Sequence, residues 1–193
     1  YIEIYVPLSE RHRGKWDTGK YSLEVSIGDG GKVLDIGDNY TRIDGLQIKV
    51  TYGGTSLYGF GIRVDGVSFS AGTSDVRISN NIIRGSLSGT GSTRGIGVWN
   101  GNETIKIWNN IVYGFNVGSS TGIQTRGTSY VYNNTVYNSV MGIRRGDEYI
   151  LAKNNLVSNA SGNDYDQTWA FAAGSDYNVS SDATSPGGTN HKI

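Results

Sequence analysis

The stretch TIKIWNNIVYGF, residues 104–115, places two asparagines inside a run of β-branched and apolar residues. Asparagine is depleted in strands and enriched in turns, so the pair indicates a bend between two short strands. The same arrangement occurs three more times, as VRISNNIIRG at 76–85, YVYNNTVYN at 130–138 and ILAKNNLVSN at 150–159. Because self-similarity on this scale is typical of repeat architectures, the asparagine pair predicts a fold built from repeated units.

The repeat has a variable length. The first asparagine of each pair falls at position 80, 109, 133 and 154, which gives steps of 29, 24 and 21 residues. A single asparagine, Asn178, continues the series 23 residues after Asn155, and Asp44-Gly45 stands upstream as a degenerate copy of the pair. A second marker, Gly-Ile, recurs between the pairs at 61–62, 95–96, 122–123 and 142–143. Each repeat is therefore predicted as strand, Asn-Asn corner, strand, variable loop and Gly-Ile strand.

These units predict an all-β solenoid of parallel strands. No stretch shows the 3.6-residue periodicity of an amphipathic helix, and WNGNE at 99–103 is the only good signal for a two-residue hairpin loop. In a solenoid, asparagines at the same corner of successive coils stack roughly 4.8 Å apart and can hydrogen-bond to one another. We expect one asparagine of each corner to form such a ladder, made of Asn81, Asn110, Asn134, Asn155 and Asn178.

The composition limits the functional classes. The chain has 193 residues, a formal net charge of zero and no cysteine, so neither disulfides nor the basic footprint of a nucleic-acid-binding protein is expected. No apolar run is long enough to span a membrane, and no signal peptide is visible. Because the chain opens directly on a strand pattern, YIEIYVP, we expect it to be a processed or trimmed piece of a longer protein.

The pattern apolar-x-apolar-x-Asn-Asn-apolar-apolar, followed by Gly-Ile, resembles the right-handed parallel β-helix repeat of the pectate-lyase-like superfamily. The resemblance is clearest over residues 75–160, and the chain is most similar to uncharacterised bacterial and phage β-helix proteins. It implies a right-handed parallel β-helix, here of about seven to eight coils at strand spacing. Function is not implied, because lyases, hydrolases, epimerases, phage tailspikes and adhesins share this fold.

The domain organisation follows from the extent of the repeats. Residues 1–182 are expected to form a single β-helix domain. Residues 183–193, which include Pro-Gly-Gly, are expected to form a C-terminal tail or contact arm. The open ends of a solenoid favour self-association or assembly into something larger unless they are capped.

Two sets of side chains are candidates for ligand binding. The first set consists of arginines that follow the Gly-Ile markers at positions of one parity, namely Arg63, Arg126 and Arg144, with Gln124 between them and Arg94 and Arg145 nearby. Positions of one parity are predicted to lie on one face of a strand. These arginines could therefore pair with the carboxylates or sulfates of a polysaccharide. Trp108 and Tyr132 occupy equivalent outward positions, where aromatic rings can stack on sugars. The alternatives are a solvated face neutralised by acidic loops and ordinary cross-strand aromatic pairs.

Candidates for catalysis and for metal binding are sparse. If the protein is a lyase, Arg144, Asp147, Glu148 and Lys153 could supply the base and neutralise a uronate carboxylate, although loop charge also explains this cluster. The calcium-binding acid clusters of pectate lyases and the paired aspartates of polygalacturonases match no motif here. Asp164 and Asp166 could bind Ca²⁺, but two carboxylates do not specify a site, so no cofactor is expected.

Two functions from different classes remain open. The first is a non-catalytic structural or recognition module of an extracellular, cell-surface or virion-surface assembly, in contact with polysaccharide. It is favoured by the short solenoid and by the lack of a catalytic signature. The second is a polysaccharide lyase or glycoside hydrolase that acts on an acidic polysaccharide. A cleft in which a base and carboxylates converge would favour the enzyme.

Overall fold

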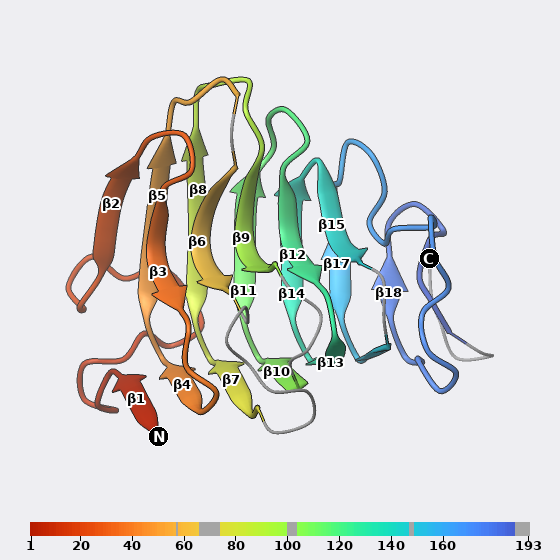
Figure 1. Ribbon diagram of the computed structural model, residues 1–193, viewed down its shortest axis with the longest axis horizontal. Helices are drawn as coiled ribbons and strands as arrows, with labels where there is room; N and C mark the ends of the chain where they lie inside the picture. Colours follow the sequence, from red (N-terminus) through yellow and green to blue (C-terminus); the bar gives the residue numbers. More distant parts are fainter. Residues whose placement is uncertain (57, 66–73, 100–103, 147–148, 188–193) are drawn as a thin grey trace.

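The computed structural model describes residues 1–56, 58–65, 74–99, 104–146 and 149–187, and all regular structure in these ranges is β-strand (Figure 1). The strands form three parallel sheets, here called A, B and C, whose strands stack along the long axis of the molecule (Figure 1). No helix that could cross a membrane occurs in these ranges. The predicted all-β architecture of stacked parallel strands is confirmed.

The three sheets contain six, seven and five strands. Sheet A comprises β1 (Ile2–Tyr5), β4 (Thr41–Asp44), β7 (Val76–Ser79), β10 (Thr104–Trp108), β13 (Thr128–Tyr132) and β16 (Ile150–Lys153). Sheet B comprises β2 (Leu23–Ile27), β5 (Gln47–Tyr52), β8 (Ile82–Leu87), β11 (Ile111–Phe115), β14 (Thr135–Ser139), β17 (Leu156–Ser158) and β18 (Val179–Ser180). Sheet C comprises β3 (Lys32–Ile36), β6 (Gly59–Val64), β9 (Thr93–Val98), β12 (Thr121–Thr125) and β15 (Met141–Arg145).

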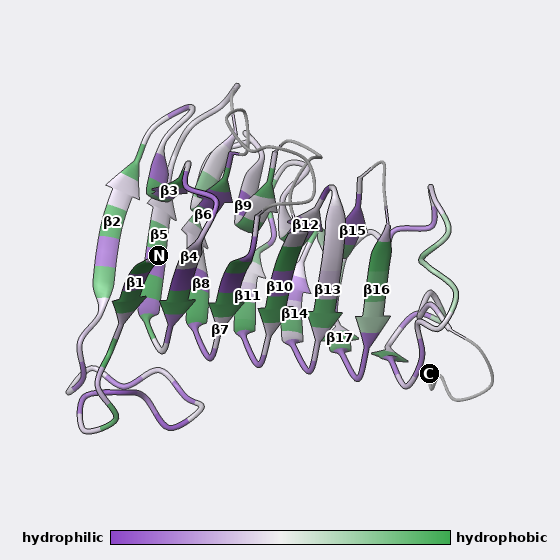
Figure 2. Ribbon diagram, turned by 60° about the horizontal axis from the view of Figure 1, so that its bottom comes forward, coloured by the Kyte–Doolittle hydropathy of each residue, from purple (hydrophilic) through white to green (hydrophobic). Residues whose placement is uncertain are grey.

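The chain visits the sheets in a fixed order, so each strand from β1 to β14 pairs with the strand three positions further along the chain, whereas β17 pairs directly with β18 (Figure 2). The register aligns the repeats as the sequence predicts: Trp108 pairs with Tyr132, and Ile123 pairs with both Ile96 and Ile143. This order is the arrangement expected for a β-solenoid, in which strand, corner, strand and loop form one coil.

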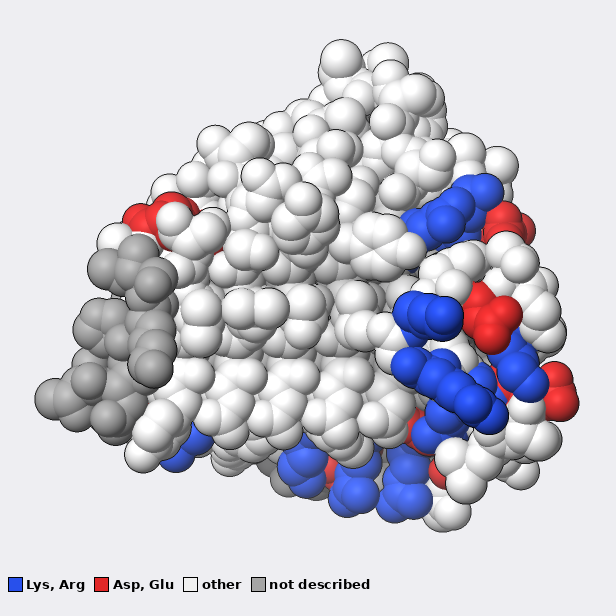
Figure 3. Space-filling model, turned by 180° about the vertical axis from the view of Figure 1, so that it is seen from behind, with Lys and Arg blue, Asp and Glu red and all other residues white. Residues whose placement is uncertain are grey.

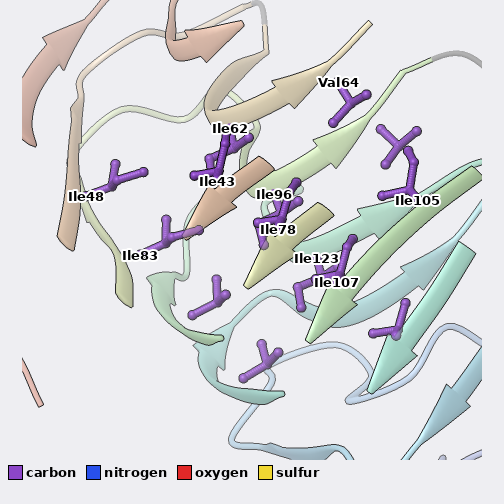
Figure 4. Packing of buried hydrophobic residues seen from close by; sticks show 14 of the residues in the cluster. Ile43, Ile48, Ile62, Val64, Ile78, Ile83, Ile96, Ile105, Ile107 and Ile123 are labelled. Atoms are coloured by element: carbon purple, nitrogen blue, oxygen red, sulfur yellow. The ribbon is translucent and has the colours of Figure 1, made fainter. Parts of the chain in front are cut away.

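The core fills the space between the sheets with stacked β-branched side chains (Figure 4). Each sheet contributes one rank at the positions marked by the repeat, such as Ile78 and Ile107 from sheet A, Ile83 from sheet B, and Ile96 and Ile123 from sheet C. All five are fully buried. Branched side chains suit this role because they pack well against like neighbours on a pleated surface.

The glycine of each Gly-Ile marker also faces this core. A Cβ atom built on Gly95 would meet the side chain of Val112 and the carbonyl oxygen of Gly122. A Cβ atom on Gly122 would likewise meet Val136. Glycine is required at these positions because there is no room for a side chain between sheets B and C.

The Asn-Asn pair forms a tight corner between sheets A and B. The first asparagine has a left-handed backbone in every copy, with φ of 56°, 57°, 55° and 56° at Asn80, Asn109, Asn133 and Asn154. Asparagine tolerates this conformation better than other non-glycine residues. The equivalent residue before Asn178 is Tyr177, which also has a positive φ, of 58°. The corner geometry therefore persists where the sequence loses the first asparagine.

The second asparagine of each corner points inward and is buried. Oδ1 of Asn110 accepts hydrogen bonds from the main-chain nitrogen of Asn81 at 3.0 Å and from its Nδ2 at 2.9 Å. The same pair of hydrogen bonds joins Asn110 to Asn134. It recurs between Asn134 and Asn155 and between Asn155 and Asn178. Each Nδ2 also donates to a carbonyl oxygen of sheet A, for example that of Ile78 for Asn110. We call these five stacked side chains the amide column.

At the N-terminal end of the amide column, the degenerate corner lies one residue further along the chain than the sequence predicts. The pairing of Asp44 with Ser79 places Gly45, with φ of 80°, at the left-handed position and Leu46 at the position of the buried asparagine. The degenerate copy is therefore Gly45-Leu46 and not Asp44-Gly45. Leu46 contributes only its main-chain nitrogen, which donates to Oδ1 of Asn81 at 2.9 Å.

The loop that follows β1 covers this end of the amide column. Nε2 of His12 lies 2.7 Å from the carbonyl oxygen of Asn80, and Arg11 forms an ion pair with Asp44. Asp44 also accepts hydrogen bonds from the hydroxyl group of Ser79 and from Nδ2 of Asn80. Burial raises the pKa of the Asp44 carboxyl, but these hydrogen bonds and the charge of Arg11 outweigh it, and the net pKa lies below its ordinary value.

The C-terminal end of the described chain is packed against the last coil. Nδ2 of Asn178 donates to the carbonyl oxygen of Pro186 at 3.1 Å, and the hydroxyl group of Thr184 accepts a bond from the main-chain nitrogen of Tyr165 at 2.9 Å. Residues 183–187 of the predicted tail therefore contact the domain. The rest of that tail, 188–193, lies outside the described residues.

Candidate functional site

An arginine-rich hollow of about 160 Å³ lies on sheet C, where β9, β12 and β15 meet the loop after β17. We call it the arginine pocket. Its lining residues are Tyr58, Arg94, Trp99, Gln124, Arg126, Arg144, Arg145, Gly146, Asp166, Thr168 and Trp169. They come from five successive coils, so the pocket depends on the register that the core and the amide column fix.

Arg94, on β9, is one of the most buried residues of the pocket, with 3% of its surface exposed. Its Nε donates to the side-chain oxygen of Gln124, but its Nη1 has no hydrogen-bond partner among the described residues. No carboxylate of the described chain forms an ion pair with Arg94. Burying a guanidinium without a counter-charge costs free energy, so an anion bound beside Arg94 would stabilise this arrangement.

Aromatic rings hold the Arg94 guanidinium in place. Its central carbon lies 4.0 Å from the centre of the Tyr58 ring, 5.5 Å from that of Phe60 and 5.6 Å from that of Trp99. Burial lowers the pKa of Arg94 to about 10, with Arg144 and Arg126 acting in the same direction and Tyr58 opposing them. The guanidinium therefore remains charged at neutral pH, and a bound anion would relieve its repulsion from the neighbouring cations.

Arg126 and Arg144 supply further positive charge. Nη1 of Arg126 donates to the carbonyl oxygen of Trp99 at 3.0 Å, which fixes its guanidinium 5.7 Å from the Trp99 ring centre, while its buried Nε has no partner among the described residues. Nε of Arg144 lies 3.5 Å from Oδ2 of Asp166, whose side chain is 3% exposed. Asp166 is the one carboxylate among the lining residues, so the described pocket has an excess of positive charge.

This concentration of cations differs from the opposite side of the molecule. Sheet C lies nearer the viewer in Figure 1, and Figure 3 shows the molecule from behind. There, Lys and Arg gather toward the N-terminal end and along the lower edge, and the broad middle of the face carries no charge (Figure 3). The middle of this face therefore shows no concentration of positive charge like that of the arginine pocket (Figure 3).

The predicted arginine set is only partly brought together. Arg126 and Arg144 line the pocket as expected, and Gln124 pairs with Arg144 in register. Arg63 lies on β6 outside the pocket, where its Nε is 2.7 Å from Oδ1 of Asp35 and its Nη2 is 2.6 Å from Oδ2 of Asp65. For Arg63, the neutralised surface that the sequence left open as an alternative describes what is found.

The predicted aromatic pair lies elsewhere. Trp108 and Tyr132 are register partners on β10 and β13 of sheet A, so they form a cross-strand pair away from the arginines of sheet C. The aromatic residues of the pocket are instead Tyr58, Trp99 and Trp169. Tyr58 and Trp169 are 41% and 55% exposed, so both present apolar ring surface to a ligand.

The candidate catalytic cluster is not assembled among the described residues. Lys153 lies on β16 of sheet A and pairs with Tyr132, whereas Arg144 lies on β15 of sheet C. The two remaining candidates, Asp147 and Glu148, lie outside the described residues. The described residues therefore provide cations for anion binding, but Lys153 does not lie beside Arg144 as a base.

Asp164 and Asp166, the candidates for Ca²⁺, have separate partners. The buried Asp164 accepts hydrogen bonds from the hydroxyl group of Ser181 at 2.7 Å and from the main-chain nitrogen of Ala160 at 3.1 Å, so it organises the C-terminal loops. Asp166 faces Arg144. The described part of the chain contains no group of three or more His, Cys, Asp or Glu that could hold a metal ion.

The residues at the centre of the pocket were not predicted from the sequence. Arg94 was noted only as lying near the arginine set, and Tyr58, Trp99 and Trp169 were not singled out. Arg94 precedes its Gly-Ile marker directly, whereas Arg63 and Arg144 follow theirs. An arginine immediately before a Gly-Ile marker, on a strand that is followed directly by a tryptophan, was the available signal.

Compared with models of protein families, with curated proteins and with solved structures, the chain matches none. The described chain is an all-β protein whose stacked strands form three parallel sheets, with an arginine pocket on sheet C. Its function has to be inferred from that pocket and from the fold.

Proposed function

We propose that this chain is a non-catalytic recognition module that binds an acidic polysaccharide in the arginine pocket, within an extracellular, cell-surface or virion-surface assembly. The observation that carries the proposal is Arg94, a buried guanidinium that lines a hollow shared with Arg126 and Arg144 and whose buried Nη1 has no partner among the described residues. Arginine suits this role because its planar fork matches the geometry of carboxylates and sulfates.

The aromatic residues favour a saccharide over a simple inorganic anion. Tyr58 and Trp169 are exposed at the pocket, and such rings can stack on the apolar faces of pyranoses. A volume of about 160 Å³ corresponds to only about five water molecules, so the pocket suits one acidic unit of a larger molecule. An acidic sugar within a chain meets both requirements.

The architecture proposed with this function is a right-handed parallel β-helix of seven coils with an asparagine ladder. Sheet B has seven strands, which supports the lower end of the expected count. The handedness rests on the rule that crossovers between parallel strands of one sheet are almost always right-handed. The double hydrogen bonds between successive buried asparagines support the ladder. Assembly through the solenoid ends remains a prediction.

Binding is favoured over the alternative, a lyase or hydrolase of acidic polysaccharide, because Lys153 and Arg144 lie on different sheets. The test measures binding of a panel of acidic and neutral polysaccharides by calorimetry, together with reducing ends and the absorbance of unsaturated products. We expect an acidic polysaccharide to bind without turnover, and Arg94→Met to weaken it by about ten- to a hundredfold through loss of a charge-assisted hydrogen bond.

Arg77→Met is the matched control, because Arg77 carries the same charge on sheet A and pairs with Asp75. This variant should bind like the wild type. Equal weakening by both variants would reduce the effect to net charge and contradict the pocket. Robust turnover would reverse the choice between binding and catalysis.

A further inference from the structure

A second hollow adjoins the arginine pocket along sheet C. It has a volume of about 240 Å³ and is lined by Gly30, Lys32, Tyr58, Phe60, Arg63 and Trp99. Tyr58 and Trp99 line both hollows. Their ring centres are 5.3 Å apart with a tilt of 56°, so together they form an aromatic ridge between the two spaces. A ligand longer than one unit can lie across this ridge.

The two hollows differ in how their cations are satisfied. In the second hollow, Arg63 is held by Asp35 and Asp65, and Nζ of Lys32 lies 3.7 Å from Oδ2 of Asp35. The hydrogen bond to Asp35 is the main reason why the pKa of Arg63 is raised, whereas burial lowers that of Arg94. The two cations that line the second hollow are therefore neutralised by two carboxylates beside it, whereas Arg94 has no carboxylate partner among the described residues.

This difference determines which chemical group suits each space. An anionic group in the second hollow would meet cations that are already paired and would lie near Asp35 and Asp65, so it would gain little. An uncharged ring would lose nothing there and would contact the aromatic ridge and Phe60, which stands edge-on to Trp99 with ring centres 5.9 Å apart. By the volume of a water molecule, the second hollow holds about eight waters, which again suits a single unit.

We infer that the two hollows are adjacent subsites, and that the ligand is a saccharide in which an acidic sugar in the arginine pocket is followed by an uncharged sugar on the other side of the Tyr58–Trp99 ridge. This inference rests on the proposed function and names the substrate class more closely. It separates saccharides with alternating acidic and neutral units from homopolymers of uronic acid.

The test compares two tetrasaccharides by calorimetry. One alternates glucuronate with N-acetylglucosamine, and the other consists of galacturonate alone. For the wild type we expect the alternating probe to bind about fivefold more tightly or better, because the homopolymer must place a carboxylate beside Asp35 and Asp65. A salt series at constant pH checks that both probes bind electrostatically.

The decisive variant is Asp35→Asn, which leaves Lys32 and Arg63 with an excess of positive charge. The Asp35 side chain is 43% exposed, so the substitution should leave the fold intact. We expect it to tighten binding of tetragalacturonate by about two- to fivefold and to leave the alternating probe nearly unchanged. Glu24→Gln, which removes an acid that pairs with Lys49 on sheet B, is the control for net charge and should change neither affinity.

The outcomes separate the two proposals. If the wild type binds tetragalacturonate as tightly as the alternating probe, and Asp35→Asn changes neither affinity, the second subsite is wrong. The arginine pocket still stands in that case, provided that Arg94→Met weakens binding of both probes. If neither probe nor any acidic polysaccharide binds, the proposed function fails and the inference fails with it.

Discussion

The corner at Asn110 and the pocket at Arg94 both bury a polar side chain almost completely, but they satisfy it in different ways. The amide of Asn110 exchanges hydrogen bonds with Asn81, Asn134 and main-chain carbonyl oxygens at 2.9–3.0 Å. The guanidinium of Arg94 donates from Nε to Gln124, but its Nη1 has no partner among the described residues. A buried polar group with all its partners inside the chain stabilises the fold, whereas one without them is a candidate for an external partner.

The largest expected effect is at the corner. Asn110→Leu removes the acceptor of two hydrogen bonds from Asn81 and the donor to the Ile78 carbonyl oxygen, and it leaves these groups buried and unpaired. We expect the free energy of unfolding to fall by about 3 kcal/mol or more, measured by urea denaturation. Loss of soluble protein would agree with this expectation.

The adjacent residue provides the control for this prediction. Asn109 has a positive φ of 57°, which glycine adopts without strain, and its side chain makes only an exposed 3.3 Å contact with Asn80. Asn109→Gly should therefore change the free energy of unfolding by less than about 1 kcal/mol. A cost equal to that of Asn110→Leu would show that the corner conformation, and not the amide column, provides the stability.

An intermediate effect is expected at Asp44, where a charged group is partly buried and fully paired. Its pKa lies below the ordinary value in the folded state, so its contribution is present above the pKa of the unfolded chain and is lost as the pH falls through the lower folded pKa. We expect acidification from about pH 5 toward 2 to cost about 1–2 kcal/mol at this site and to release the loop that Arg11 attaches.

Hydrogen exchange of residues 9–21 as a function of pH measures this release. Asp44→Asn keeps an acceptor but removes the charge, so its loop should exchange faster at neutral pH and respond less to acid. If wild type and variant lose protection in parallel between pH 5 and 2, another carboxylate is responsible for the acid response.

The sequence could predict the corner that repeats along the chain, but it could not predict the pocket. The amide column repeats one residue type at one corner, so Asn81 and Asn110 could be assigned from the pattern of neighbouring apolar residues alone. The copy at Gly45-Leu46 was misplaced by one residue because neither of its residues carries the amide that marks the register. The pocket depends on loops whose lengths vary between coils, so nothing in the local pattern shows that Tyr58 and Trp169 lie beside Arg94.

The smallest change in the free energy of unfolding is expected for Arg94→Met. This variant tests whether Arg94, unlike Asn110, lacks a partner inside the chain. Methionine keeps much of the side-chain volume among the rings of Tyr58 and Trp99 and removes a buried charge that no carboxylate of the described chain balances. Replacing an unpaired buried ion with an apolar side chain is neutral or stabilising, so the free energy of unfolding should stay within about 1 kcal/mol of the wild type or rise. A loss of about 3 kcal/mol or more, as on breaking a buried ion pair, would mean that Arg94 is satisfied internally and is structural like Asn110.

Titration with the acidic saccharide completes the measurement, because a ligand that binds only the folded state raises the free energy of unfolding as its concentration increases. The rise should appear in the wild type and in Asn109→Gly, and be absent in Arg94→Met, since only the last variant lacks the buried guanidinium that the ligand pairs with.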